Sequence, residues 1–228
     1  MNNSVTGQFV LLAINQNKYP NILIDYDLLG GTFSLGLYEL VKHEVLEILP
    51  DEKQRDDIKL SVKRNLPVEL KHLSQLYEAV KFSEKKTISD IIYTFSFTIS
   101  SHYYNQCLDD ITLYLTEQGE LQQDTKKGFF NREKVVLNVT DEKVKMIVEG
   151  IRHNITAEAS DIDRVVLAKV LQKTGLLNIY FSKEENKTLK QEIDNVLTNS
   201  SEPIVRATLE VMDDILGIIL AVITSTVL

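Results

Sequence analysis

The C-terminal segment is the feature that most restricts how this chain can fold. Fourteen consecutive residues, Ile215 to Leu228, carry no charge, and Asp213 and Asp214 directly precede them. A membrane-spanning helix needs roughly 20 apolar residues, and at about 1.5 Å per residue this segment covers only about 21 Å of a roughly 30 Å hydrocarbon layer. Apolar residues recur at helical spacing here and upstream, at Val205, Leu209, Met212, Leu216 and Ile219. We therefore expect a core helix of a helical protein, not a membrane span.

The composition is that of one globular domain over residues 1–228. Hydrophobic residues make up 43% of the chain and charged residues 25%, which allows a sizeable core. Four prolines and nine glycines leave no room for a long low-complexity linker. The single cysteine, Cys107, excludes an internal disulfide and fits a reducing compartment. The N-terminus has no basic region ahead of a long apolar stretch. We expect a cytoplasmic protein, in peripheral contact with a membrane if it contacts one.

The charge balance disfavours nucleic acid as a partner. The formal net charge is −8, whereas nucleic-acid binding depends on lysine and arginine side chains that neutralise phosphates. The densest basic cluster is KKGFFNREK, which contains Lys126, Lys127, Arg132 and Lys134. A short charge run of this kind most often faces solvent, although a binding patch remains the alternative.

The order of periodic segments predicts a mainly α fold, a single helical domain around a central helix bundle with a protruding β-hairpin. Three segments combine an apolar helix, a turn and a short strand-like piece: 35–48, 108–122 and 165–181. The charged segment 50–65 is interpreted as a surface connection, and helices are expected near 69–81 and 87–99. The glycines of GTFSLG (31–36) are interpreted as the flexible start of a helix. Asp161 is expected to cap a helix, with Asp163 in its first turn.

The hairpin carries the candidate interface. Residues 120–124 and 135–139 flank a Lys-Lys-Gly turn region, which is a β-hairpin signal. Phe129 and Phe130 near its tip are poorly placed for the hairpin's own core, and large exposed rings require a covering surface. We predict a homo-oligomer in which Phe129 and Phe130 form the interface; the alternative is a hairpin that folds back over its own monomer.

No pattern in the sequence predicts catalysis or a cofactor. The four histidines are not spaced as metal ligands, and Cys107 has no C-x-x-C partner. The acidic pairs Asp109–Asp110 and Asp213–Asp214 are adjacent helical residues, which do not face each other. We therefore expect no catalytic residues, metal site or cofactor, and no enzyme. Lys42, His43 and the basic hairpin are the groups to examine for a concave basic face beside Asp109 and Asp110.

In the order of its elements, the chain resembles a divergent, prokaryotic-type member of the Golgi phosphoprotein 3 family. The resemblance covers nearly the whole chain and depends on several segments in order: FVLLAI (9–14), GGTFSLGLYELVKHEVLEI (30–48), LYLTEQGELQQDTKKGFFN (113–131), DIDRVVLAKVLQKTGLL (161–177) and ILGIILAVITSTVL at the C-terminal end.

The resemblance implies the helical fold with its protruding hairpin, which serves self-association in the family. Eukaryotic members are peripheral membrane proteins that bind phosphatidylinositol 4-phosphate and hold glycosylation enzymes in the Golgi. Their headgroup pocket uses a tryptophan and several basic residues. This chain has no tryptophan, and the basic positions correspond to Phe33, Leu108 and Asp110. An aspartate at a phosphate site repels the ligand, so the fold is expected without the phosphoinositide site.

We therefore expect a non-enzymatic peripheral membrane or protein adaptor, with anionic lipid or a membrane-protein tail as its partner, in addition to further copies of itself. The alternative from a different class is a winged-helix-like DNA-binding regulator, because each helix–turn–strand unit could form the core of a winged helix. The net charge of −8, and the carboxylates of Asp109, Asp110 and Glu117 on the candidate recognition helix, oppose that alternative.

Overall fold

The computed structural model describes residues 4–16, 26–49, 58–97, 102–127, 133–155, 161–199 and 217. Its elements in chain order are α1 (Val5–Asn15), α2 (Tyr26–Lys42), β1 (Leu46–Leu49), β2 (Lys59–Val62), the 3-10 helix η1 (Val68–Leu73), α3 (Ser74–Phe82), α4 (Ile88–Phe97), α5 (His102–Glu117), β3 (Leu121–Lys127), β4 (Glu133–Val139), α6 (Asp141–Ile155), α7 (Ile162–Lys173), α8 (Leu177–Tyr180) and α9 (Lys183–Asn199). The predicted mainly helical fold with a hairpin is confirmed.

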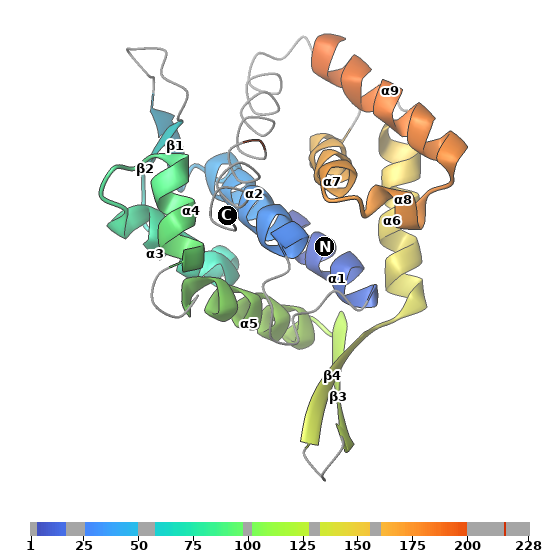
Figure 1. Ribbon diagram of the computed structural model, residues 1–228, viewed down its shortest axis with the longest axis horizontal. Coiled ribbons are helices and arrows are strands. Elements are labelled where there is room, and N and C mark those ends of the chain that lie inside the picture. The colour runs from blue at the N-terminus through green and yellow to red at the C-terminus, as the bar shows by residue number, and fades with distance from the viewer. Residues whose placement is uncertain are drawn as a thin grey trace, which may run out of the picture.

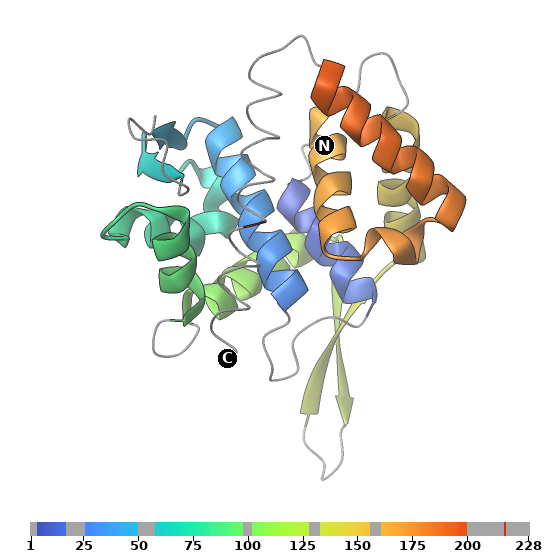
Figure 2. The ribbon, with the colours of Figure 1, turned by 45° about the horizontal axis from the view of Figure 1, so that its top comes forward.

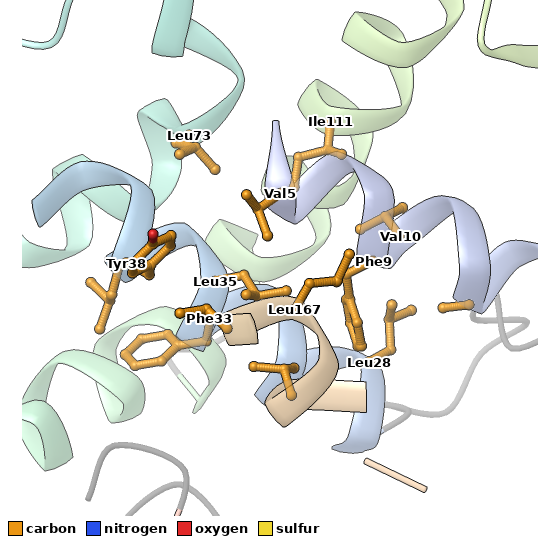
Figure 3. Packing of buried hydrophobic residues seen from close by; sticks show 14 of the residues in the cluster. Val5, Phe9, Val10, Leu28, Phe33, Leu35, Tyr38, Leu73, Ile111 and Leu167 are labelled. Carbon is orange, nitrogen blue, oxygen red and sulfur yellow. The ribbon is translucent and has the colours of Figure 1, made fainter. Parts of the chain in front are cut away.

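Helices α1 and α2 form the centre of the molecule. Every residue of α1 from Val5 to Ile14 is buried, as expected for a helix that is apolar on nearly all sides. Helices α3, α4 and α5 lie on one side of this pair, and α6 to α9 lie on the other (Figures 1 and 2). The close view in Figure 3 shows Phe9 of α1 between side chains of α2 and Leu167 of α7. This core fixes the positions of the surrounding helix ends.

Two glycines allow α1 and α3 to approach α2 closely. A Cβ atom on Gly31 would lie 2.0 Å from Cζ of Phe9, and one on Gly36 would lie 2.6 Å from Cδ2 of Leu76. The prediction that these glycines begin a flexible helix is therefore wrong, because α2 already begins at Tyr26 and contains both. Their role is close packing: a side chain at either position would occupy the volume of its neighbour.

The two antiparallel strand pairs test the predicted connections. Strands β1 and β2 pair from Leu46 with Val62 to Leu49 with Lys59. The interpretation of segment 50–65 as a surface connection is wrong at its end, because Lys59–Val62 forms a strand with buried Leu60. Strands β3 and β4 pair from Leu121 with Val139 to Lys127 with Glu133, so the predicted hairpin is confirmed.

The third predicted helix–turn–strand unit ends differently from the other two. Helix α7 is followed by Gly175, whose positive φ of 75° turns the chain, and then by the short helix α8 instead of a strand. Leu177 and Phe181 are both buried, and their spacing of four residues needs one helical turn to point them to the same side. The predicted cap at Asp161 is confirmed, since its side chain accepts a hydrogen bond from the Asp163 amide at 3.1 Å.

Two predictions concern apolar segments, and the described residues test only one of them. None of the helices in the described ranges combines the length and apolarity needed to cross a membrane. The predicted core helix at Ile215–Leu228 lies outside the described residues, apart from Gly217. Its burial remains a prediction.

Candidate functional site

A cavity of about 820 Å³ opens where the N-terminus of α1 meets α2, η1 and α5. Its size is in the range of small-molecule sites. The lining residues are Ser4, Val5, Glu39, Lys42, His43, Val68, Glu69, Leu70, Lys71, His72, Ser74, Gln75, Asp110, Leu113, Tyr114, Glu117, Gln118 and Asp163. These residues are distant in sequence, so the fold alone brings them together.

Buried Glu39 of α2 accepts hydrogen bonds at the N-terminus of α1. Its Oε1 accepts hydrogen bonds from Ser4 Oγ at 2.8 Å and from the Thr6 amide at 2.6 Å. Ser4 is the N-cap of α1, and its Oγ accepts from the Gly7 amide at 3.0 Å. Two amides of the first turn are thereby satisfied, and the carboxylate lies at the positive end of the helix dipole. The arrangement stabilises Glu39 as an anion.

His72 of η1 completes this cluster from the side of α5. Its Nε2 lies 3.1 Å from Ser4 Oγ and 3.7 Å from Glu39 Oε2, and its ring stacks on that of Tyr114 with a centroid separation of 4.4 Å. The single hydroxyl proton of Ser4 is donated to Glu39, so the Ser4 contact requires a proton on Nε2 of His72. In the neutral ring Nδ1 is then an acceptor, and this buried atom has no hydrogen-bond partner among the described residues.

The direction of the hydrogen bond between Ser4 and His72 is the reverse of that in a catalytic serine–histidine pair. A serine nucleophile donates its proton to the histidine base, and a carboxylate orients the other ring nitrogen. Here Ser4 accepts from His72, and Glu39 approaches the same nitrogen as Ser4. The two α1 amides that could stabilise an oxyanion are bound to Glu39 and Ser4. The cluster is arranged to hold a helix end and not to activate a hydroxyl group.

The hydrogen bonds to Glu39 have a larger combined effect on its pKa than its burial has. Burial raises the pKa of a carboxyl group, but the hydrogen bonds from His72, Thr6 and Ser4 lower it, and the net pKa lies below the ordinary value for glutamate. Glu39 is thus ionised in the folded protein at neutral pH.

A second group joins the C-terminal end of α2 to the N-terminal end of α7 at the rim of the cavity. Lys42 Nζ lies 2.6 Å from Asp163 Oδ1, and Tyr38 donates its hydroxyl to the same carboxylate at 2.6 Å. Burial, followed by this hydrogen bond to an anion, raises the pKa of Tyr38 well above that of an ordinary tyrosine. The ammonium group of Lys42 is therefore paired with the carboxylate of Asp163.

The remaining lining is acidic. Asp110 accepts from Ser74 Oγ at 3.1 Å and from Gln75 Nε2 at 3.3 Å, both of which are uncharged donors. Burial and the neighbouring Asp110 charge raise the pKa of Asp109, in keeping with uncompensated negative charge on this part of α5. Among the described residues, the lining contains five carboxylates, those of Glu39, Glu69, Asp110, Glu117 and Asp163, and two lysines, Lys42 and Lys71.

The structure places the residues singled out in the sequence as follows. Lys42 and His43 both line the cavity, and a concave face does lie beside Asp110, but its described lining carries more carboxylates than lysines and so is not a basic face. Phe129 and Phe130 lie outside the described residues, so the interface prediction remains untested. No cluster of three or more potential metal ligands occurs in the described ranges.

The three positions that the sequence resemblance assigns to a phosphoinositide pocket do not form an anion site. Phe33 is fully buried, with its ring centroid 5.6 Å from that of Phe95, and Leu108 is also buried. The third position, Asp110, adds negative charge to the cavity.

Sequence reasoning missed Ser4, Glu39 and His72. Ser4 before an apolar run is a recognisable N-cap signal. Nothing in the local pattern links it to a glutamate 35 residues away. No family model matches this chain, and no curated protein is similar enough to be matched.

Proposed function

We propose that this protein is a non-enzymatic adaptor of the Golgi phosphoprotein 3 type, which holds a partner protein in the cytoplasm or at a membrane surface. The order of the described elements supports the proposal, since a central helix pair comes first and a later helix, α5, leads directly into a hairpin. The hydrogen-bond polarity at Ser4 and His72 also favours a role without catalysis.

The projecting β3–β4 hairpin is the observation that carries this proposal. It extends away from the helical body in both views (Figures 1 and 2). The β3 side chains from Gln122 to Thr125 are exposed, and within the described residues the sheet has two strands. The base of the hairpin packs on the helical core through Leu121, Leu137 and Val139. Beyond that base, a two-stranded ribbon with open edges is marginally stable in water and gains stability from a covering surface. We propose that this surface belongs to another copy of the chain, with Phe129 and Phe130 at the contact.

A protein tail is a better partner for this adaptor than an anionic lipid headgroup. The positions that correspond to the phosphoinositide pocket are Phe33 and Leu108, which are buried, and Asp110, which would repel a phosphate group. Membrane attachment in this proposal therefore occurs through the partner protein.

The self-association part of the proposal is tested by light scattering on the double variant Phe129→Ser/Phe130→Ser. We expect the wild type to be an oligomer and the double variant to be smaller, with unchanged helicity by circular dichroism. The matched control is Phe82→Ser on α3, which removes a ring that is 62% exposed outside the hairpin and should leave the mass unchanged. A monomeric wild type, or a double variant of wild-type mass, contradicts the proposed interface.

The adaptor part is tested by co-sedimentation with neutral and anionic vesicles, in parallel with capture of cytoplasmic membrane-protein tails. We expect capture of a tail and weak sedimentation with vesicles that lack it. Failure to bind any tail and any vesicle would falsify the adaptor function, irrespective of the oligomeric state.

A further inference from the structure

Helix α2 has a buried side that faces the space between α4 and α7. Phe33 marks the direction of α4, because its ring lies 5.6 Å from that of Phe95. Tyr38 marks the direction of α7, because it donates its hydroxyl to Asp163. Figures 1 and 2 both show α4 and α7 on opposite sides of α2. With 3.6 residues per turn, the α4–α7 side of α2 is formed by three further buried residues: Gly30, Ser34 and Leu37.

This side of α2 combines small residues with a buried hydroxyl group. Gly30 and Ser34 are four residues apart, so another backbone can approach α2 closely there. Ser34 is fully buried, and its Oγ has no hydrogen-bond partner among the described residues. A buried hydroxyl group normally has a partner. The side is therefore built to receive a further segment that brings polar groups as well as apolar side chains.

Lys169 of α7 lies beside the same space. Arg164 marks the side of α7 that faces α1, because it donates to Gln8. Val166 and Lys169 lie on the opposite flank of α7, and both are buried. The α4–α7 side of α2 is likewise turned away from α1, since Gly31 faces α1. Lys169 is only 8% exposed, and a lysine this deeply buried requires an anionic partner.

Residues 200–228, which follow α9 in the chain, have the properties that this surface requires. The apolar stripe from Val205 to Ile219 would extend about 21 Å along a helix, close to the about 25 Å of the 17-residue α2. Asp213 flanks this stripe, whereas Asp214 lies on the opposite side of such a helix. Gly217, the one described residue of the segment, is helical and exposed, and a Cβ atom on it would meet nothing within 4 Å.

We propose that the segment 205–219 binds as a helix on the α4–α7 side of α2, with its apolar stripe against α2 and the carboxylate of Asp213 paired with Lys169. The small residues of α2 admit the stripe, and the ion pair compensates the buried ammonium group. Gly217 lies off the stripe and faces solvent in this arrangement. The surface is separate from the hairpin on which the proposed adaptor function depends.

Thermal unfolding of the full chain tests the ion pair. Asp213→Asn should lower the melting temperature by about 5 °C or more, because it leaves the buried ammonium group of Lys169 without its anion. Asp214→Asn is the matched control: it makes the same change one residue away, opposite the stripe, and should shift the melting temperature by less than about 2 °C. Equal effects of the two variants overturn the proposed pair.

The double variant Lys169→Met/Asp213→Asn distinguishes a pair from two independent effects. Lys169→Met alone leaves Asp213 without its cation and should also lower the melting temperature. The double variant should be more stable than Asp213→Asn, because no charge is then left buried without a partner. A double variant whose loss equals the sum of the two single losses contradicts a contact between these residues.

Hydrogen exchange followed by mass spectrometry tests the binding surface. Gly30→Leu places a large side chain on the α4–α7 side of α2 and should speed amide exchange in 205–219 by about tenfold or more. Gly217→Leu makes the same change where a Cβ atom meets open space, and should leave this exchange unchanged. Ser34→Val is a milder obstruction and keeps the test available if Gly30→Leu does not fold. Unchanged exchange in the folded obstructing variants overturns the proposal.

Disulfide trapping identifies the copy of the chain that supplies the segment. The native Cys107 is fully buried, so it should not compete with an introduced pair. In dilute solution, Lys169→Cys/Asp213→Cys should form a disulfide within one chain, seen as a faster-migrating monomer on non-reducing gels. Lack of a disulfide, or a disulfide-linked dimer that shows binding of the segment from a second copy, overturns the proposal.

Discussion

Removal of the Glu39 carboxylate should destabilise the fold more than removal of any exposed carboxylate. Its side chain is 5% exposed and accepts hydrogen bonds from Ser4 and from the Thr6 amide, so solvent screens these interactions little. In Glu39→Ala the Thr6 amide and the Ser4 hydroxyl lose a charged acceptor, and His72 loses a nearby carboxylate. Truncation of one member of a buried, hydrogen-bonded charge cluster costs about 3–5 kcal/mol, compared with a total stability of about 5–15 kcal/mol for a domain.

Glu39→Gln separates the effect of charge from that of shape. Glutamine keeps one carbonyl acceptor for Ser4 and Thr6. Its NH2 group would then face the N–H of His72, and the contact with His72 would no longer involve a charged carboxylate. We expect a loss of about 1–3 kcal/mol, between the wild type and Glu39→Ala. Glu142→Ala, at an exposed position on α6, is the control and should change stability by less than about 1 kcal/mol.

The pH dependence of the stability difference between the wild type and Glu39→Gln gives the sharpest test. The folded-state pKa of Glu39 is lowered, so the folded state favours the ionised form. Its contribution is fully present above the unfolded pKa of about 4.3, and is lost as the pH falls through the lower folded pKa. The advantage of the wild type over Glu39→Gln should therefore be constant near neutral pH and shrink below about pH 4.

Urea denaturation, followed by circular dichroism from neutral to acidic pH, measures this difference. The reasoning is refuted if Glu39→Ala is as stable as Glu142→Ala at neutral pH, or if the advantage over Glu39→Gln does not change on acidification. The first result would mean that the α1 end does not depend on Glu39; the second would mean that Glu39 is not ionised in the fold.

Three further predictions concern packing and the rim of the cavity. Gly31→Ala should lower the melting temperature, with a cost of about 1–3 kcal/mol or more, because the new methyl group would overlap the ring of Phe9; calorimetry that finds an unchanged transition contradicts the close approach of α1 and α2. Asp163→Asn should cost only about 1 kcal/mol in urea titrations, because its pair with Lys42 is partly exposed, and high salt should reduce the difference from the wild type. Deletion of residues 215–228 should give unfolded or insoluble protein, because burial of each leucine or isoleucine contributes about 1.5–3 kcal/mol; a truncated protein that unfolds cooperatively contradicts the core assignment.

Local patterns in the sequence were sufficient for most of the elements. The β3–β4 hairpin follows from a turn between two extended segments, and the N-cap of α7 follows from Asp161 before an apolar helix. Both depend on interactions among neighbours in the chain, so a short window contains the information. The same reasoning failed at α8, where burial of Leu177 and Phe181 on one side selects a helical turn after Gly175. It also failed at β2, whose paired residues in β1 lie ten to sixteen positions earlier in the chain.

The tertiary structure alone decided the candidate site and the role of the helix glycines. From the sequence alone Gly31 is interpreted as a flexible residue; the structure shows that it makes room for Phe9 of another helix. Ser4, Glu39 and His72 come from three elements, and their hydrogen bonds depend on helix positions that the whole core determines. The carboxylates of the cavity likewise come from four elements, α2, η1, α5 and α7, that the packed core brings together. The physical reason is that backbone preferences and caps act over a few residues, whereas a cavity is formed by side chains that meet only after the core has packed.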